Sequence, residues 1–427
     1  MSIIKEHERK YFMKKDRLIV YILFFLFLLS TRLLTYQEIN LYIYKCLLYL
    51  SVFFLFVFVF SKNSCAVQMM KIYPSYRYVY IFIFLPAFTC VSCLFAHSQA
   101  ILYSIQSFIP HYLILTYFVL IYYKIKPVYI VKIILIFSIL RTGLTLIEQF
   151  TYPYNPFAFR ADYFDEYGNF RELEQRSGFY RFLIGDAYFL PLFSCFFSFV
   201  QLIKKIDYRY LLIFLFSALG IYMDGSRQVM IAFVVPLVLF PVLIRSKRKF
   251  KFIVLFAILA IVVYLFYEEL FGELILKTNE EDGTFNGRLL SYSYFWNNTG
   301  AWYTKLFGNG IGYGSKTEWG RYLMLLHENS IRPHDVGVVG AVFMLGWGLV
   351  VCFFMYYWHV IRKNWKDIDI AVRLYLISIL IMIPFIFPLY NGTLPDYEMF
   401  LSFIFYLVDA SIIESKKKRS CGIIKYH

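Results

Sequence analysis

The sequence contains little charge, few acidic residues and few cysteines. Only 17% of its 427 residues are charged, with 28 Asp and Glu against 43 Lys and Arg, whereas soluble domains carry about 25% charged residues. This deficit excludes a single soluble domain and a disordered chain, since both need more polar surface. The seven cysteines are scattered along the chain, so we expect no disulfide framework, no metal site and no cofactor.

Long apolar runs take the place of the missing charge. Hydrophobic residues make up 60% and aromatic residues 22% of the chain, and the mean hydropathy is +0.59. Because a helix needs about 20 mostly apolar residues to cross a bilayer, the sequence predicts an all-α integral membrane protein with about 12 transmembrane helices in a single domain, 1–427. The predicted spans are 18–34, 41–60, 78–96, 100–123, 127–150, 182–203, 210–223, 228–244, 251–267, 336–361, 370–389 and 398–413.

The basic residues indicate how these spans are oriented. With the N-terminus inside, 28 of the 43 Lys and Arg residues fall in inner segments and 11 in outer ones, as the positive-inside rule requires of cytoplasmic loops. We therefore predict both termini in the cytoplasm and interpret the net charge of +15 as a topology signal. Two larger extracytoplasmic loops remain, 151–181 and 268–335, and the second is predicted to be partly helical.

Arginine is the main cation of the outer segments, whereas lysine predominates in the inner ones. A planar guanidinium binds phosphate or carboxylate oxygens through two parallel hydrogen bonds, so the outer arginines predict a site for an anion such as a lipid pyrophosphate. The alternative is that they pair with acidic residues of the same loops. The predicted substrate-binding arginines of the two loops are Arg176, Arg181 and Arg332.

Two outer arginines are the main candidates for catalysis. Arg227 follows Asp224 and Gly225 at the predicted outer start of a helix, where backbone amides add positive potential for an anion. A salt bridge to Asp224 is the structural alternative. Arg288 is predicted in the first turn of a loop helix that has Asn286 as its N-cap.

Two histidines lie close together before the next predicted span. His327 and His334 lie beside Arg332 and Asp335, and we expect Asp335 to cap the helix that begins there. A histidine in this place titrates near neutral pH and can accept a proton from a hydroxyl group. We therefore predict one of the two as a catalytic base and Asp335 as part of the substrate site.

Two charged residues lie within predicted spans or at their ends. Arg141 has Glu148 two turns further along the same helix face, and Asp186 lies at the outer end of its span. Charges at such depth usually face a cavity, so Arg141 and Asp186 are predicted to bind substrate. An ion pair between Arg141 and Glu148 is the alternative. The glycine-rich stretch 306–314 predicts a tight turn beside the membrane.

Four stretches of this pattern together resemble the O-antigen polymerase and ligase superfamily, the integral-membrane glycosyltransferases of bacterial surface polysaccharides. They are the loop-to-span segment 176–190, the Ser226-Arg227 helix start within 224–232, Asn286-Gly-Arg288 followed by the glycine-rich 306–312, and the segment 334–346 that leads into the next span. The resemblance extends over roughly 176–350, and the order of the stretches supplies its specificity.

The resemblance implies a metal-independent glycan transfer at the outer face of the bacterial inner membrane. The donor would be an oligosaccharide on undecaprenyl diphosphate, with Arg227 and Arg288 holding the pyrophosphate and a loop histidine acting as base. In the common ligase pattern Asn directly follows that histidine, whereas Glu328 follows His327 here. This departure favours His334 as the base and a polymerase over a ligase.

The function implied is polymerisation of lipid-linked repeat units into O-antigen or capsular polysaccharide. A ligase that moves the finished glycan onto lipid A core or protein is the first alternative, and a polysaccharide transporter or flippase is the second. We expect the lipid-linked oligosaccharide and membrane lipid as partners, with a chain-length regulator and a flippase as further candidates, and no nucleic acid.

Overall fold

Helices make up almost all of the computed structural model, which describes residues 2–31, 33, 41–62, 66–152, 175–176, 179–180, 182, 188–243, 282–329, 331–389 and 395–421. The first half contains α1 (Ser2–Thr31), α2 (Leu41–Ser61), α3 (Ala66–Ile72), α4 (Tyr76–His97), α5 (Ile101–Phe108), η2 (Pro110–Leu115), α6 (Thr116–Tyr122), α7 (Pro127–Thr151), β1 (Gln175–Arg176), β2 (Phe179–Tyr180), α8 (Phe189–Lys204), α9 (Tyr208–Asp224) and α10 (Arg227–Leu243). The second half contains α13 (Asp282–Asn297), α14 (Trp302–Phe307), η4 (Gly314–Lys316), α15 (Glu318–Glu328), η5 (Pro333–Val336), α16 (Gly337–Tyr356), η6 (Tyr357–Arg362), η7 (Trp365–Asp367), α17 (Ile370–Met382) and α18 (Pro395–Ser420).

The predicted helical membrane class is confirmed, but the count of twelve spans is not. Among the described residues, four helices are long and apolar enough to cross a bilayer, namely Ile43–Ser61, Tyr76–His97, Pro127–Thr151 and Pro333–Arg362. A fifth is obtained if Ile101–Phe108 and Pro110–Tyr122, which meet at 51°, count as one span. Shorter apolar helices occupy several other predicted spans, and the predicted span 251–267 lies outside the described residues.

Two predicted spans are interrupted. The span predicted over 100–123 bends at Pro110, because proline lacks the amide hydrogen that a continuous helix needs and clashes with the preceding turn. α16 is broken at Gly346, whose φ of 81° and ψ of 163° are not helical. By contrast, the predicted polar turn at 224–228 is found between α9 and α10.

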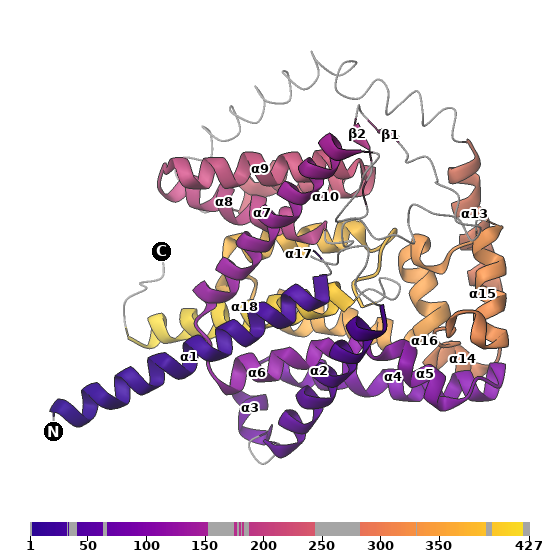
Figure 1. Ribbon diagram of the computed structural model, residues 1–427, viewed down its shortest axis with the longest axis horizontal. Helices are drawn as coiled ribbons and strands as arrows, with labels where there is room; N and C mark the ends of the chain where they lie inside the picture. The colour runs from indigo at the N-terminus through magenta and orange to yellow at the C-terminus, as the bar shows by residue number, and fades with distance from the viewer. Residues whose placement is uncertain are drawn as a thin grey trace.

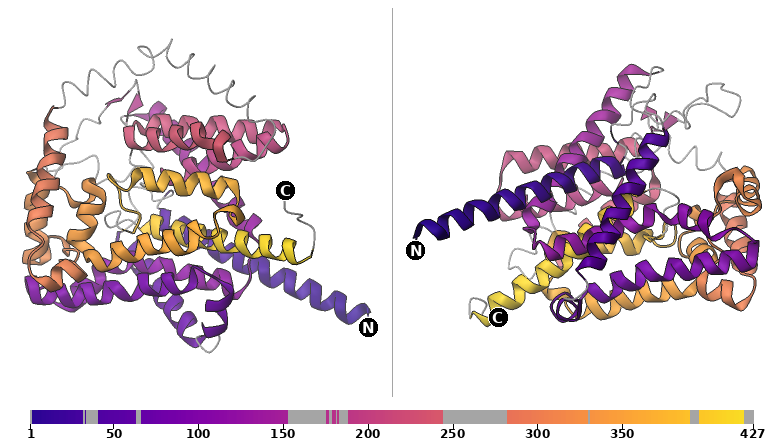
Figure 2. Two further views of the ribbon diagram at one scale, coloured as in Figure 1. Left: turned by 180° about the vertical axis from the view of Figure 1, so that it is seen from behind. Right: turned by 60° about the horizontal axis from the view of Figure 1, so that its bottom comes forward.

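Two groups of elements position the predicted site residues. Figure 1 shows α8, α9 and α10 together in the upper part of the view and α13 to α16 at the right, with α17 below the first group and α18 below α17. α7 packs against α8 and α9, and α10 packs along α17. α16 contacts α13, α14 and α4, so the predicted loop helices lie on a transmembrane helix (Figure 2).

Apolar side chains occur both in the interior and on the outside of the helical bundle, as expected of a protein in a membrane. Large aromatic side chains fill the interior, and three of them, Phe27, Phe137 and Phe193, are fully buried. Phe53, Phe54 and Phe95 lie on the outside and are at least 60% exposed. Apolar side chains on the outside of a helical bundle suit a surrounding of lipid.

Candidate functional site

A polar seam joins α7 to α9. The Ser138 and Ser217 hydroxyl oxygens are 3.1 Å apart, and one turn further on Thr142 packs against Gly220, where an added Cβ would collide with its hydroxyl. At the end of the seam a guanidinium nitrogen of Arg141 donates to Asp224 Oδ1 at 2.9 Å. Small and hydroxyl residues let helices approach closely in a membrane, and here they bring two opposite charges together.

The seam fixes the position of Arg227. Asp224 is the last residue of α9, Gly225 turns the chain in the left-handed conformation with φ of 63°, and α10 begins at Arg227. The predicted helix-start position of Arg227 is therefore found. The carboxylate of Asp224 accepts a hydrogen bond from Arg141, a partner that the sequence did not predict. Arg141, which was predicted to bind substrate, thus forms an ion pair with Asp224.

Arg288 lies on a loop helix, as predicted, but not in its first turn. α13 begins at Asp282, four residues before Asn286, so the predicted N-cap role of Asn286 is wrong. Residues 282–285 include no proline that would prevent the helix from starting upstream of Asn286. The Arg288 side chain is exposed. Burial raises the pKa of Tyr292, one turn further along α13, and the positive charge of Arg288 acts in the opposite direction.

The segment with the histidines is anchored to α13 by one serine. The Arg332 amide donates to Ser291 Oγ at 3.2 Å, and Ser291 in turn donates to the Gly287 carbonyl at 2.7 Å. Ser291 follows Arg288 by three residues, which places both on one side of α13. Ser291 was not among the residues predicted from the sequence, and its spacing of three residues from Arg288 is the one sequence feature that could have indicated it.

Three elements of the predicted outer loop are thus joined, and their candidate residues are here termed the outer cluster: Arg288 of α13, His327 of α15, and Arg332, His334 and Asp335 at η5. The His327 and His334 ring centroids are 5.8 Å apart, and His334 Nε2 lies 3.9 Å from Asp335 Oδ1. Asp335 does not cap α16, because its own η5 turn intervenes and Val336 takes the N-cap position. The carboxylate is therefore free to face His334.

The electrostatics of the outer cluster favour a neutral histidine and an anionic ligand. Burial, followed by the charges of Arg332 and His334, lowers the pKa of His327, while Asp335 acts in the opposite direction. The Nε atom of Arg332 is buried and has no hydrogen-bond partner among the described residues. A buried guanidinium N–H without an acceptor is costly, and a phosphate oxygen would satisfy it.

The glycine-rich stretch attaches α14 and the chain that follows it to α16, which is broken at Gly346. The Asn309 and Gly310 amides donate to the Phe343 and Met344 carbonyls, each at 2.9 Å, just before the break at Gly346. The stretch is therefore an irregular segment whose backbone is hydrogen-bonded to a helix, whereas the sequence predicted a tight turn. These bonds hold α14 and the chain that follows it against the membrane-spanning part.

The first predicted outer loop is only partly described. Arg176 lies in β1, paired with Phe179 of β2, and its side chain is outside the described residues, as are Arg181 and Asp186. The Gln149 side chain at the end of α7 accepts from the Tyr180 amide at 3.0 Å and donates to its carbonyl at 2.6 Å. The hairpin is thereby held to the helix that carries Arg141.

Arg227 and the outer cluster are linked through α17. α10 packs along α17, whose C-terminal end leads to the Ile383 and Phe385 carbonyls that accept from the Val338 and Gly337 amides. Arg227 begins α10 and so belongs to the α7–α10 group, whereas Arg288 lies on α13 and belongs to the α13–α16 group. The predicted catalytic arginines therefore belong to two packing units joined by one helix.

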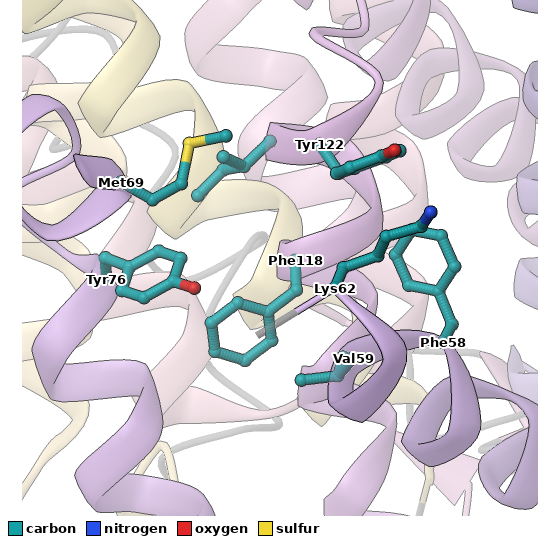
Figure 3. Close-up of a pocket in the computed structure, with 8 residues that line it drawn as sticks. Phe58, Val59, Lys62, Met69, Tyr76, Phe118 and Tyr122 are labelled. Atoms are coloured by element: carbon teal, nitrogen blue, oxygen red, sulfur yellow. The ribbon is translucent and has the colours of Figure 1, made fainter. Parts of the chain in front are cut away.

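The pocket shown in Figure 3 is not part of this site. It lies between α2, α3, α4 and α6 and is lined mainly by apolar side chains, with Lys62 near the Tyr122 ring. Its volume of about 20 Å³ is enough for little more than one water molecule. No group of three or more His, Cys, Asp or Glu that could hold a metal ion occurs within the described part of the chain.

These features define a multi-pass helical membrane protein with a cationic, histidine-containing cluster on its loop helices. Residues 212–334 match the model of a protein family described as O-antigen ligase. The match confirms the resemblance to the O-antigen polymerase and ligase superfamily over a region that contains Arg227, Arg288 and both histidines. Members of that family are membrane glycosyltransferase-like enzymes, and the match gives no support to the transporter alternative. A comparison with curated proteins finds no match.

Proposed function

We propose that this protein polymerises oligosaccharide repeat units carried on undecaprenyl diphosphate, at the outer face of the bacterial inner membrane. The observation that carries the proposal is the outer cluster within the region that matches the O-antigen ligase family. In it Arg332 lies beside two neighbouring histidines and is bonded to α13, the helix that carries Arg288. A diphosphate needs cations and an acceptor hydroxyl needs a base, and the cluster offers both.

In the proposed reaction, the hydroxyl oxygen of the acceptor unit attacks the anomeric carbon of the donor glycan. The bond from that carbon to the diphosphate oxygen breaks, and its electron pair leaves with undecaprenyl diphosphate. Arg288 and Arg332, together with Arg227 from the α7–α10 group, stabilise the charge that develops on the leaving phosphate. No metal ion takes part in this scheme.

His334 is the base in this scheme and takes the hydroxyl proton. Asp335, 3.9 Å from His334 Nε2, stabilises the imidazolium that forms. Burial and the Arg332 charge lower the pKa of His327, which disfavours a second positive charge beside the protonated His334. Its proposed role is to orient the acceptor hydroxyl group.

The test is a polymerisation assay with purified full-length protein in nanodiscs and undecaprenyl-diphosphate-linked repeat units. Wild-type protein should produce a ladder of longer lipid-linked glycans, and Arg288→Ala should produce only single units at equal protein level. Absence of any product longer than one repeat unit with wild-type protein would refute the proposal.

A ligase is the second candidate, because the matching family model is described as O-antigen ligase. Deletion in the native strain distinguishes the two activities. Loss of a polymerase leaves single repeat units attached to the final acceptor, whereas loss of a ligase leaves none attached and accumulates lipid-linked polymer.

A further inference from the structure

A polar pocket of about 270 Å³ lies at the start of α17. Its walls come from the turn before α17, the first turn of α17 and the last turns of α18. The charged side chains that line it are Asp367, Asp369, Arg373, Glu414 and Lys418. The other end of α17 leads to the outer cluster, so the pocket is about 20 Å away along the helix, at the opposite end. It is therefore independent of the proposed transferase site.

Each carboxylate of the pocket already has a cation. Asp367 pairs with Arg419 and also accepts from Ser415 Oγ at 2.9 Å. Asp369 lies 3.8 Å from Lys204 Nζ, and Glu414 lies 2.6 Å from Lys418 Nζ. These pairs neutralise the acidic lining, so the pocket does not repel an anion as its composition alone would indicate.

Arg373 has no salt-bridge partner among the described residues, although the charge of nearby Asp369 acts on it. Its guanidinium lies 5.8 Å from the Trp365 ring centroid, within the range of a cation–π contact that orients the planar group. Its Nε atom is buried and finds no acceptor in the described part of the protein. An unpaired buried N–H of a fixed guanidinium is suited to a phosphate oxygen.

The surroundings of the pocket are those of a membrane interface. Arg362 lies 3.7 Å over the ring of Trp358, and that ring is 58% exposed. Lys417, Lys418 and Arg419 lie in the last turn of α18. Exposed tryptophan and clustered basic residues are typical of the headgroup region of a leaflet that contains anionic lipid.

We propose that this pocket, termed the α17–α18 pocket, binds the phosphate group of a phospholipid headgroup, with Arg373 as its anchor. The pocket is large enough for a headgroup, and its carboxylates are paired with cations. Its one guanidinium lies near a tryptophan ring and has an N–H without an acceptor among the described residues. The proposal does not depend on the transferase function.

Native mass spectrometry of the full-length protein with phosphatidylglycerol tests the proposal. Wild-type protein should retain one lipid more tightly than the others, and Arg373→Met should weaken that retention about tenfold or more, since a hydrogen bond to a charged group is lost. Lys363→Met is the matched control, because Lys363 is an exposed cation of the same end outside the pocket. Equal retention by Arg373→Met and wild type would overturn the proposal.

Two further arms separate the alternatives. Arg373→Lys keeps the charge but not the planar fork, so it should fold as wild type and show intermediate retention; retention equal to wild type would argue against Arg373 as the anchor. Inorganic phosphate is the soluble probe. If it raises the unfolding temperature of wild type but not of Arg373→Met, and phosphatidylglycerol is not retained, the site binds free phosphate and the lipid assignment is wrong.

Discussion

Arg141 and Asp224 form a 2.9 Å ion pair between α7 and α9, with side chains only 3% and 9% exposed. The pair closes a seam of hydroxyl and glycine residues and ends three residues before Arg227. Two charges buried in this way are tolerated because each compensates the other. The pair therefore couples the geometry of α7, which also holds the β1–β2 hairpin, to the turn that presents Arg227.

The first prediction concerns the stability that this pair protects. Arg141→Leu should destabilise the protein by about 3–5 kcal/mol, because Asp224 would remain buried without a cation. The double variant Arg141→Leu with Asp224→Leu should recover most of the loss, since neither charge then remains. Thermal unfolding of the purified protein measures both, and a single variant that unfolds at the wild-type temperature would show that Asp224 has another cation.

The second prediction concerns the arginines of the outer cluster. Arg288→Met and Arg332→Met should each lower the polymerisation rate by about 10²–10³, the usual cost of removing one group that stabilises developing negative charge. Arg321→Met is the control, because Arg321 is an exposed arginine of α15 outside the cluster. Equal losses in all three variants would indicate a general effect of outer charge instead of a specific site.

The sequence predicts the helical class, the α9–α10 turn and the gathering of both histidines beside Arg332, because these follow from local composition and spacing. It does not predict that Arg141 pairs with Asp224, 83 residues away, since that contact depends on how two helices are rotated against each other. The cap roles of Asn286 and Asp335 were wrong for a related reason. A capping residue type is common, and tertiary contacts decide where a helix begins.

The third prediction concerns pH. Burial and the charges of Arg332 and His334 lower the pKa of His327 below its ordinary value of 6.5. The unfolded chain therefore binds a proton at a higher pH than the folded protein, so stability should decrease as the pH falls below 6.5 towards the lowered pKa. Arg332→Gln removes one cause of the shift, and the midpoint for His327 should move back towards higher pH.

Histidine proton resonances of selectively labelled protein measure this midpoint directly. His327→Gln identifies the resonance and should also remove its share of the pH-dependent loss of stability. A His327 midpoint that is the same in wild type and Arg332→Gln would contradict the close approach of these two side chains.

The last prediction concerns the joint between the glycine-rich stretch and α16. Gly346 has φ of 81°, and an added Cβ would collide with the Leu306 carbonyl and the Gly308 amide, which are backbone atoms that cannot move aside. Gly346→Ala should therefore cost more than about 2 kcal/mol through backbone strain and overpacking. Gly143→Ala in α7 is the matched control, because nothing lies within 4 Å of its added Cβ, and replacing a helical glycine should stabilise the protein by about 0.5–1 kcal/mol. Thermal unfolding should thus shift in opposite directions for the two variants; shifts of the same sign would mean that α16 is not broken at Gly346.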